Sequence, residues 1–167
     1  MHDKLTKSDI EKMQKEVEHR KLVVRKEAIE AVKEARAQGD LSENFEYYAA
    51  KREKNMNESR IRYLEKMIKT AEIVSDDSKE GEVGINNTVS LYFEEDDMTE
   101  EYKLVTNVRA SSLNNLISLE SPLGKAIMGK KVGDRVAVKV NDDYSYYVVI
   151  KAIDESTDDS MDEIRRY

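Results

Sequence analysis

The sequence contains no cysteine and only two histidines, His2 and His19. It can therefore form no disulfide and no thiolate metal site, and two isolated histidines are too few for a histidine-based metal centre. No apolar run approaches the ~18–20 residues that cross a bilayer, and the start MHDKLTKSD lacks the apolar core of a signal peptide. We expect a cytoplasmic protein that binds no metal when it is free.

Strong helix breakers are also scarce, because the chain has one proline, Pro122, and its first glycine is Gly39. Ser8 followed by Glu11 predicts a capping box at the start of a first helix. Gly39 predicts the end of that helix, because glycine tolerates positive φ. A second helical stretch runs over residues 45–74. In both stretches, small or apolar residues recur every three or four positions, which predicts one inward stripe per helix.

These stripes predict an antiparallel pair of uninterrupted helices, a coiled-coil hairpin with arms of roughly 45 Å at ~1.5 Å per residue. The expected inward residues are Ile10, Met13, Val17, Arg20, Val24, Ala28, Ala31 and Ala35 in the first helix, and Phe45, Ala49, Arg52, Met56, Ser59, Tyr63, Met67, Thr70 and Val74 in the second. The expected facing pairs are Ala35 with Ala49, Ala28 with Met56, and Val17 with Met67.

The turn between the helices, residues 39–44, carries two acids, Asp40 and Glu43. In a structural interpretation, Asp40 is the N-cap of the second helix and Glu43, three positions later, completes its capping box. In a functional interpretation, the two carboxylates are hard oxygen ligands that can hold Mg²⁺ through a few contacts, although they are too few to cage it alone. The spacing is compatible with both interpretations.

Beyond the turn, residues 51–62 carry a local excess of positive charge. The basic residues are Lys51, Arg52, Lys54, Arg60 and Arg62, against Glu53 and Glu58. Such a cationic surface can bind phosphates, and the neighbouring acids can hold a divalent cation that is shared with another site. This is the arrangement used in two-metal phosphoryl chemistry. The alternative is a solvated helix face with the ion pairs Glu58–Arg62 and Glu65–Lys69.

Charge also divides the chain, since residues 1–74 carry 17 basic against 15 acidic residues and residues 75–167 carry 11 against 20. After a polar hinge the periodicity changes from helical to alternating. The predicted strands are residues 88–93, 101–105, 116–119, 135–140 and 146–150. Ser121 as N-cap and Pro122 at the first helical position predict a short helix that ends at Gly129.

The predicted fold class is therefore α+β. The domains are a hairpin with an acidic tip (1–74), a hinge (75–81), a small, mostly antiparallel β domain with one short helix (82–154), and an acidic tail (155–167) that we expect to be mostly disordered.

Two segments resemble a known family. Residues 34–51, EARAQGDLSENFEYYAAK, and residues 121–134, SPLGKAIMGKKVGD, are similar to the Gre-type transcript cleavage factors of bacterial RNA polymerase. The resemblance extends over residues 8–153, and the chain departs from the family pattern at residues 106–112. It implies that the hairpin enters the secondary channel of the polymerase. It also implies an FKBP-like C-terminal domain that grips the channel rim.

The resemblance implies a role for several residues. Asp40 and Glu43 would support a catalytic Mg²⁺ that is shared with the polymerase active site. Tyr47, Lys51, Arg52 and Lys54 would position the RNA 3′ end. Ser121 and Pro122 would contact the polymerase.

The implied function is that of a monomeric accessory factor, not an enzyme in itself, which stimulates the polymerase's own cleavage of backtracked RNA 3′ ends. A regulator of the same fold that occupies the channel and inhibits or modulates the polymerase without cleavage is the alternative, and the intact Asp40–Glu43 pair argues against it. The FKBP-like resemblance also makes prolyl isomerase activity a third candidate function. With no tryptophan and no phenylalanine after Phe93, an aromatic proline pocket would have to come from tyrosines.

Overall fold

A computed structural model describes residues 2–39 and 44–166. The predicted α+β class, a long helical hairpin followed by an FKBP-like, mostly antiparallel β domain with one short helix, is confirmed. The chain forms two compact units. One contains residues 10–71, and the other combines residues 2–9 with residues 72–166. Residues 2–9 thus pack with the β domain, whereas the boundaries predicted from sequence assign them to the hairpin.

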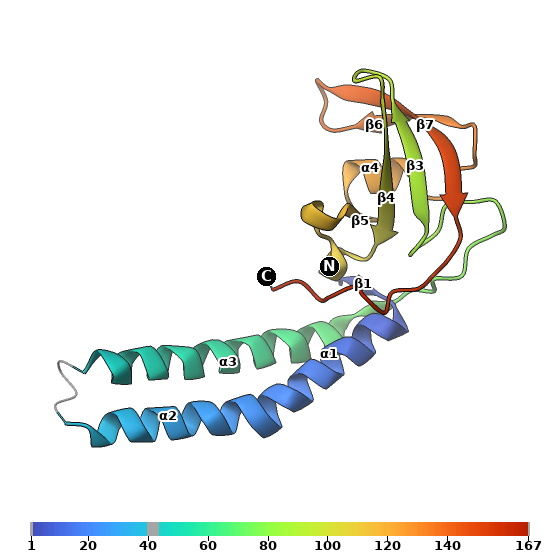
Figure 1. Ribbon diagram of the computed structural model, residues 1–167. Coiled ribbons are helices and arrows are strands. Elements are labelled where there is room, and N and C mark those ends of the chain that lie inside the picture. Colours follow the sequence, from blue (N-terminus) through green and yellow to red (C-terminus); the bar gives the residue numbers. More distant parts are fainter. Residues whose placement is uncertain (1, 40–43, 167) are drawn as a thin grey trace. The chain divides into compact units, whose positions relative to one another are not determined.

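The first arm of the hairpin consists of α1 (Lys7–His19), a π-helical segment η1 (Arg20–Val24) and α2 (Arg25–Ala37). The second arm is the single helix α3 (Phe45–Thr70), which runs antiparallel to α2 (Figure 1). The prediction of two uninterrupted helices is correct for the second arm and wrong for the first. The π-helical turn contains neither proline nor glycine, so the sequence carries no breaker that could have announced it.

The start of α1 also differs from the prediction. The capping box is formed by Thr6 and Asp9: the Asp9 amide donates to Thr6 Oγ1 at 3.2 Å, and the Thr6 amide donates to Asp9 Oδ2 at 3.0 Å. The predicted box of Ser8 and Glu11 is wrong by two residues. Both patterns satisfy the same spacing rule, and the buried aspartate side chain favours the earlier one.

The inward face of α3 is rotated by about one residue from the predicted stripe. Its buried residues are Asn57, Arg60, Ile61 and Leu64. The predicted inward residues Phe45, Arg52 and Met56 are exposed, and Ala49 is exposed too. The expected pairs Ala35–Ala49 and Ala28–Met56 are therefore wrong, and the pair of Val17 with Met67 stays a prediction. The stripe was assigned from the three- and four-residue spacing alone, but Asn57 and Arg60, which lie off that stripe, are buried with hydrogen-bonding partners on the first arm.

In the second unit, α3 is followed by a two-residue strand. This strand, β2 (Glu72–Ile73), pairs in parallel with β1 (Lys4–Leu5), so the predicted helix stops at Thr70 rather than at Val74. The main sheet has the order β5-β4-β3-β7-β6, with only the β4–β5 pair parallel. Its strands are β3 (Thr88–Phe93), β4 (Met98–Val105), β5 (Leu116–Ser118), β6 (Arg135–Lys139) and β7 (Ser145–Asp154).

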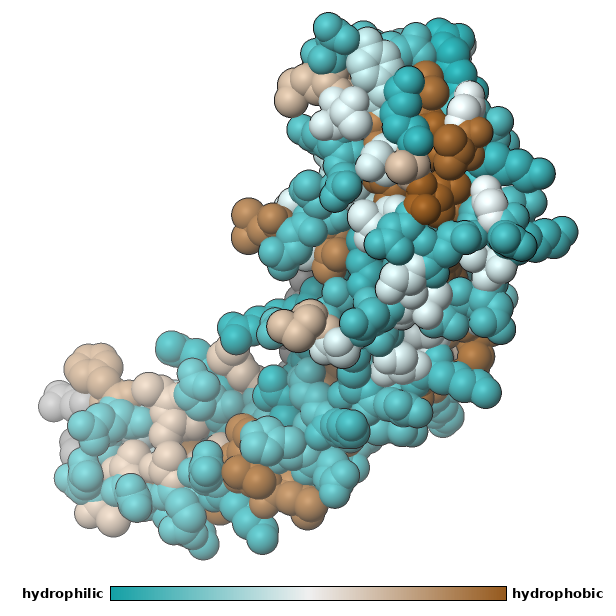
Figure 2. Space-filling model, turned by 45° about the vertical axis from the view of Figure 1, so that its right-hand side comes forward, coloured by the Kyte–Doolittle hydropathy of each residue, from teal (hydrophilic) through white to brown (hydrophobic). Residues whose placement is uncertain are grey.

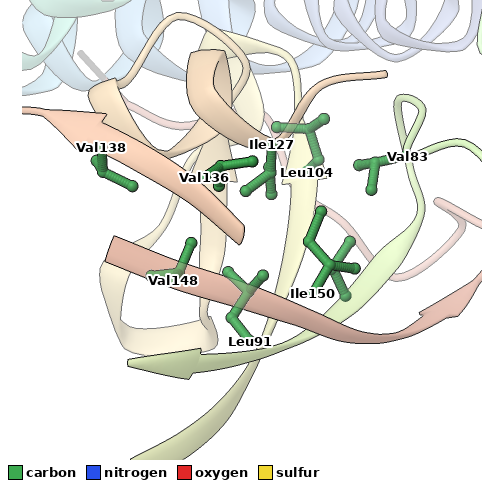
Figure 3. Packing of buried hydrophobic residues seen from close by; sticks show 9 residues of the cluster. Val83, Leu91, Leu104, Ile127, Val136, Val138, Val148 and Ile150 are labelled. Carbon is green, nitrogen blue, oxygen red and sulfur yellow. The ribbon is translucent and has the colours of Figure 1, made fainter. Parts of the chain in front are cut away.

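The core of this unit lies between the sheet and the short helix α4 (Pro122–Ile127), which contacts β5 and β6. Figure 3 shows its apolar side chains converging from the strands and from α4. The fully buried members of this cluster are Val83, Val89, Leu91, Leu104, Ile127, Val136, Val138, Val148 and Ile150. On the face shown in Figure 2, by contrast, the hairpin surface mixes hydrophilic residues with scattered apolar ones. Among its described residues, the hairpin buries a smaller set of apolar side chains, Met13, Val17, Ala35, Ile61 and Leu64.

Two 3₁₀ turns, η2 (Asn107–Arg109) and η3 (Ser112–Asn114), connect β4 to β5. Residues 155–166 form no helix or strand, but they contact the β domain. The Asp162 carboxylate accepts hydrogen bonds from Lys103 Nζ and Arg109 Nη1, both at 2.9 Å. The amide of Arg165 donates to the Val108 carbonyl at 2.7 Å. Disorder of the tail stays a prediction, and these contacts provide a way to test it.

Candidate functional site

The candidate site is the connection between the two helices of the hairpin. Asp40 and Glu43 lie outside the described residues, so the structure gives no geometry for them. It does describe both flanks. The helix α2 ends with Gln38 as C-cap, and Gly39 follows with φ of +127°. The predicted role of Gly39, a residue of positive φ that ends the first helix, is confirmed.

Asn44 closes the base of the connection. Its side-chain Oδ1 accepts a hydrogen bond from the Tyr47 amide at 3.0 Å, which makes Asn44 the N-cap of α3. Its Nδ2 donates to the Ala35 carbonyl of α2 at 2.5 Å. One amide side chain thus caps the second helix and ties it to the end of the first.

This cap tests the interpretation in which Asp40 and Glu43 cap the second helix. If Asp40 were the N-cap of the second helix, that helix would begin at position 41, but it begins at Phe45 with Asn44 as cap. Asn44, and not Asp40, is therefore the N-cap of α3, while the part of the interpretation that concerns Glu43 lies outside the described residues. The sequence did not predict Asn44 as the cap, because Asp40 followed three positions later by Glu43 matches the capping-box pattern.

Tyr47, on the first turn of α3, faces a cationic side chain. The Arg36 guanidinium lies 5.7 Å from the centroid of its ring, and the ring of Tyr48 meets it edge-on at 5.5 Å. A hydrogen bond with Arg36 is the main reason why the pKa of Tyr47 is lowered, and the charge of Lys51 acts in the same direction. Tyr47 is half-buried, whereas Phe45 is 85% exposed, so the two rings present different surfaces.

The basic stretch divides into two groups. Farther from the tip, its charges are paired across the hairpin: Glu58 accepts a bidentate bond from Arg25, and Arg60 binds Glu16. The predicted pair Glu58–Arg62 within one helix is therefore wrong. The predicted pair Glu65–Lys69 is wrong too, because Glu65 binds Lys21 of the first arm at 2.5 Å.

Closer to the tip, the basic side chains have no such neighbours. Lys51 and Arg52 are exposed and Lys54 is half-buried, and none of them forms an ion pair with a residue in the described ranges. The positive excess predicted from the sequence is thus concentrated on the first turns of α3, nearest to Asp40 and Glu43 in the chain. This location leaves the three cations available to an anionic ligand.

Ser121 and Pro122 lie at the start of α4, as predicted. Ser121 Oγ accepts a hydrogen bond from the Gly124 amide at 3.0 Å and donates one to the Ser118 carbonyl at 2.6 Å. The hydroxyl thus donates one hydrogen bond and accepts one inside the protein. Pro122 is exposed, so any contact made by this pair with another molecule falls to the proline ring and its neighbours.

Sequence reasoning missed a buried charge cluster in the second unit. Arg109 is completely buried, and its guanidinium binds Asp9, Asn86 and Asp162. The same segment was singled out only as a departure from the family pattern. Nothing in the sequence pairs positions that lie so far apart in the chain.

Among the described residues there is no group of three or more histidines, cysteines and acids that could hold a metal ion. A small cavity of about 190 Å³ lies among Phe93, Glu95, Asp96, Tyr144 and Tyr146. This volume is below the ~300 Å³ at which pockets for drug-sized ligands begin. No helix in the part of the chain that the structure describes is both long and apolar enough to span a membrane.

Comparison with known proteins places the chain in a family. The family profile described as "Transcription elongation factor, N-terminal" matches residues 4–73, and "Transcription elongation factor, GreA/GreB, C-term" matches residues 77–155. The transcription elongation factor GreA of Thermoanaerobacter pseudethanolicus is 47% identical over 137 residues, which cover 81% of this chain and 87% of that protein. GreA of Acholeplasma laidlawii is 43% identical over 149 residues, covering 89% and 94%.

Among solved structures, the GreA factor homolog 1 (Gfh1) protein of Thermus thermophilus is 28% identical and has a TM-score of 0.43, with 92% of this chain and 99% of that chain covered. Both family profiles together span nearly the whole sequence, in the same order as the two predicted domains. The chain belongs to the GreA/GreB family of transcription elongation factors.

Proposed function

We propose that this protein inserts its hairpin into the secondary channel of bacterial RNA polymerase and stimulates cleavage of backtracked RNA by the polymerase. In keeping with its family, it is an accessory factor and not an enzyme by itself. Asp40 and Glu43 are the groups that it delivers. The observation that carries the proposal is the Asn44 cap of α3, because this helix has an N-cap that is neither of the two acids.

Two carboxylates fit a Mg²⁺ ion only in part. They supply hard oxygen ligands of the kind that Mg²⁺ prefers, but the ion needs further ligands in octahedral geometry. In this proposal the polymerase and the RNA phosphates supply those ligands, and the ion would activate a water for attack on the RNA chain. The chain itself contributes the two anions and the rigid arms that carry them.

The remaining residues around the tip would bind and orient the RNA. Lys51, Arg52 and Lys54 would attract its phosphates, since these cations lie within one turn of α3 without ion pairs among the described residues. Tyr47, held against Arg36, offers a ring edge and a hydroxyl beside them. Pro122 at the exposed start of α4 would contribute to the polymerase contact, with Ser121 holding the helix start in shape.

The test is to add the protein to a stalled elongation complex that carries 3′-end-labelled, backtracked RNA. The proposal predicts faster release of a short labelled 3′ fragment and resumption of synthesis. The alternative regulator would slow synthesis while leaving the RNA intact. No specific observation favours that alternative.

A further inference from the structure

The hairpin contains a structural irregularity that its proposed function does not by itself require. In η1, the amide of Arg25 donates to the carbonyl of Arg20, five residues earlier. In an α-helix that donor comes from four residues along. The turn therefore holds one more residue than an α-helical turn. The second arm, α3, has no matching insertion among its described residues.

A side chain of the opposite arm, Asn57, forms hydrogen bonds with the first residue of this turn. Asn57 Nδ2 donates to the Arg20 carbonyl at 3.2 Å, and Asn57 Oδ1 accepts from Arg20 Nη1 at 3.0 Å. The Arg20 carbonyl thus accepts two hydrogen bonds, one from the π-helical turn and one from Asn57. Asn57 is only 4% exposed, so both its amide groups are used at this place and not in solvent.

Ion pairs fix the two arms on either side of the π turn. Before it, Glu16 accepts hydrogen bonds from Arg20 at 2.8 Å and from Arg60 of α3 at 2.9 Å. After it, Arg25 forms its bidentate pair with Glu58 at 2.7 and 2.9 Å. Because these pairs lie on both sides, the first arm cannot slip by one residue along α3 without breaking at least one of them.

We propose that the π-helical turn stores one extra residue of the first arm, that Asn57 holds it there, and that this sets the rotational position of Asp40 and Glu43 at the tip. The effect of this position on RNA cleavage rests on the proposed function. If the stored residue were released, the segment between the turn and the tip would rotate by about 100° and advance by ~1.5 Å. Single π-helical turns of this kind occur frequently at functional sites. Asn57 is thus a positioning residue, because it acts on the acids through the helix.

The position of the acids matters because reacting groups tolerate little displacement. A misplacement of ~1 Å can reduce a reaction rate by about 10²-fold. Residues outside the turn itself would not take up such an error, since α2 and the facing part of α3 run side by side along their length (Figure 1). Val23, by contrast, is 41% exposed within the turn, so its loss removes little packing.

Two deletions test the stored residue. Deleting Val23 should convert the π turn into an α-helical turn and leave the residues on both sides in place. Deleting Lys33, an exposed residue of α2, is the matched control, because it must rotate the segment next to the tip. We expect the Val23 deletion to melt within about 2 °C of wild type and the Lys33 deletion at least about 5 °C lower. Equal losses in both variants would overturn the inference.

The role of Asn57 is tested by rescue. Asn57→Leu should reduce the rate of stimulated RNA cleavage on the order of tenfold or more, with polymerase affinity unchanged. Adding the Val23 deletion to Asn57→Leu should restore the rate to within about threefold of wild type, because no extra residue then remains to be held. If Asn57 only stabilised the hairpin, the two changes would add instead. A double variant no better than Asn57→Leu alone, or a silent Asn57→Leu, would refute the positioning role.

These outcomes stay separate from those of the proposed function. If wild type fails to stimulate cleavage, the proposed function is wrong, while the melting temperatures of the two deletion variants still decide whether the turn stores a residue. If wild type is active and the two deletions behave alike, only the inference about the π turn is wrong.

Discussion

Asp9 and Arg109, 100 residues apart in the sequence, form an ion pair in which both side chains are completely buried. Arg109 Nε donates to Asp9 Oδ1, and Asp9 Oδ2 accepts from the Thr106 hydroxyl at 2.6 Å. The pair joins the start of α1 to the 3₁₀ turn after β4, both of which belong to the second unit. Removing Arg109 would leave the Asp9 charge buried without its counter-ion, whereas removing Asp9 would leave Arg109 paired with Asp162 alone.

The first prediction concerns this pair. Arg109→Met should lower the free energy of unfolding of the β domain by about 3–5 kcal/mol, because the Asp9 charge then stays buried without a counter-ion. Asp9→Asn should lower it by less, because Arg109 keeps its ion pair with Asp162. The double variant should lose clearly less than the sum of the two, since it buries fewer unpaired groups. Urea unfolding followed by the fluorescence of the domain's tyrosines measures all three. Strict additivity would mean that the pair has no energetic coupling.

The second prediction concerns the acidic tail. The Asp162 side chain is 10% exposed and forms ion pairs with both Lys103 and Arg109. Together with Asp9, which also binds Arg109, it balances the charges of these two cations. Asp162→Asn should destabilise the β domain by about 1–3 kcal/mol. It should also speed proteolytic cleavage within residues 155–166.

The matched control for the tail is Glu163→Gln, because Glu163 is the neighbouring acid and is exposed. It should change neither the stability nor the rate of proteolysis. If Asp162→Asn behaves like this control, and the wild-type tail is already cut rapidly, then the tail is disordered as the composition predicts, and its contacts contribute nothing.

The third prediction is a pH dependence of the hairpin. Burial by itself would raise the pKa of Glu16, but hydrogen bonds from Arg60 and Arg20, together with their charges, leave it below its ordinary value of 4.5. A lowered pKa in the folded state means that the stabilising effect of Glu16 is present above pH 4.5. This effect is lost as the pH falls through the lower folded value.

Glu16→Gln should therefore reduce the melting temperature at neutral pH and flatten its fall as the pH drops below about 4.5. Circular dichroism at 222 nm, recorded across this range, follows the helices directly. Glu18→Gln is the control, because Glu18 is exposed on the same helix. An unchanged acid limb in the Glu16 variant would show that the ion pairs with Arg20 and Arg60 do not couple to folding.

The fourth prediction concerns the cations near the tip. Replacing Lys51, Arg52 and Lys54 with alanine should weaken crosslinking to the RNA 3′ end, reduce stimulated cleavage, and make both less dependent on salt. Replacing Lys66 and Lys69, exposed residues at the far end of α3, should have little effect on either. Equal crosslinking by the two sets of variants would show that the basic stretch is only a solvated helix face.

The sequence predicted the periodic elements well where one rule was sufficient. Strand β3 and the start of α4 lie where alternation and the Ser121–Pro122 pair predicted them, because turn and capping chemistry are local. The hairpin itself followed from two long stretches without a breaker.

The errors arose where polar side chains are buried. The stripe of α3 was misplaced because Asn57 and Arg60 occupy its inward face, and they can do so only because Arg20 and Glu16 meet them there. The capping box of α1 shifted for a related reason, since Asp9 is held by Arg109 from a distant segment. Such partners depend on the three-dimensional fold, so no local spacing could have predicted them.

The candidate site was predictable only in part. The acids, the cations of α3 and Tyr47 came from motif and charge, but the role of Asn44 did not. Its two bonds, to the Tyr47 amide and to the Ala35 carbonyl, require the end of α2 to lie beside the start of α3. Once these bonds are known, the acids no longer need to be explained as helix caps.

The account as a whole depends most directly on Asp40 and Glu43. Replacing them with Asn and Gln keeps their shape and most of their hydrogen bonding but removes two anionic ligands. Because Asn44 caps α3, the melting temperature and the affinity for polymerase should stay close to wild type. Neither quantity can therefore account for a loss of activity.

The decisive measurement is the rate at which this double variant stimulates RNA cleavage in a backtracked elongation complex, followed over a series of Mg²⁺ concentrations. The account predicts that stimulation collapses at ordinary Mg²⁺ and partly returns as Mg²⁺ is raised, because mass action offsets weakened coordination. Full stimulation by the double variant at ordinary Mg²⁺ would contradict the proposal that these two carboxylates serve the polymerase active site.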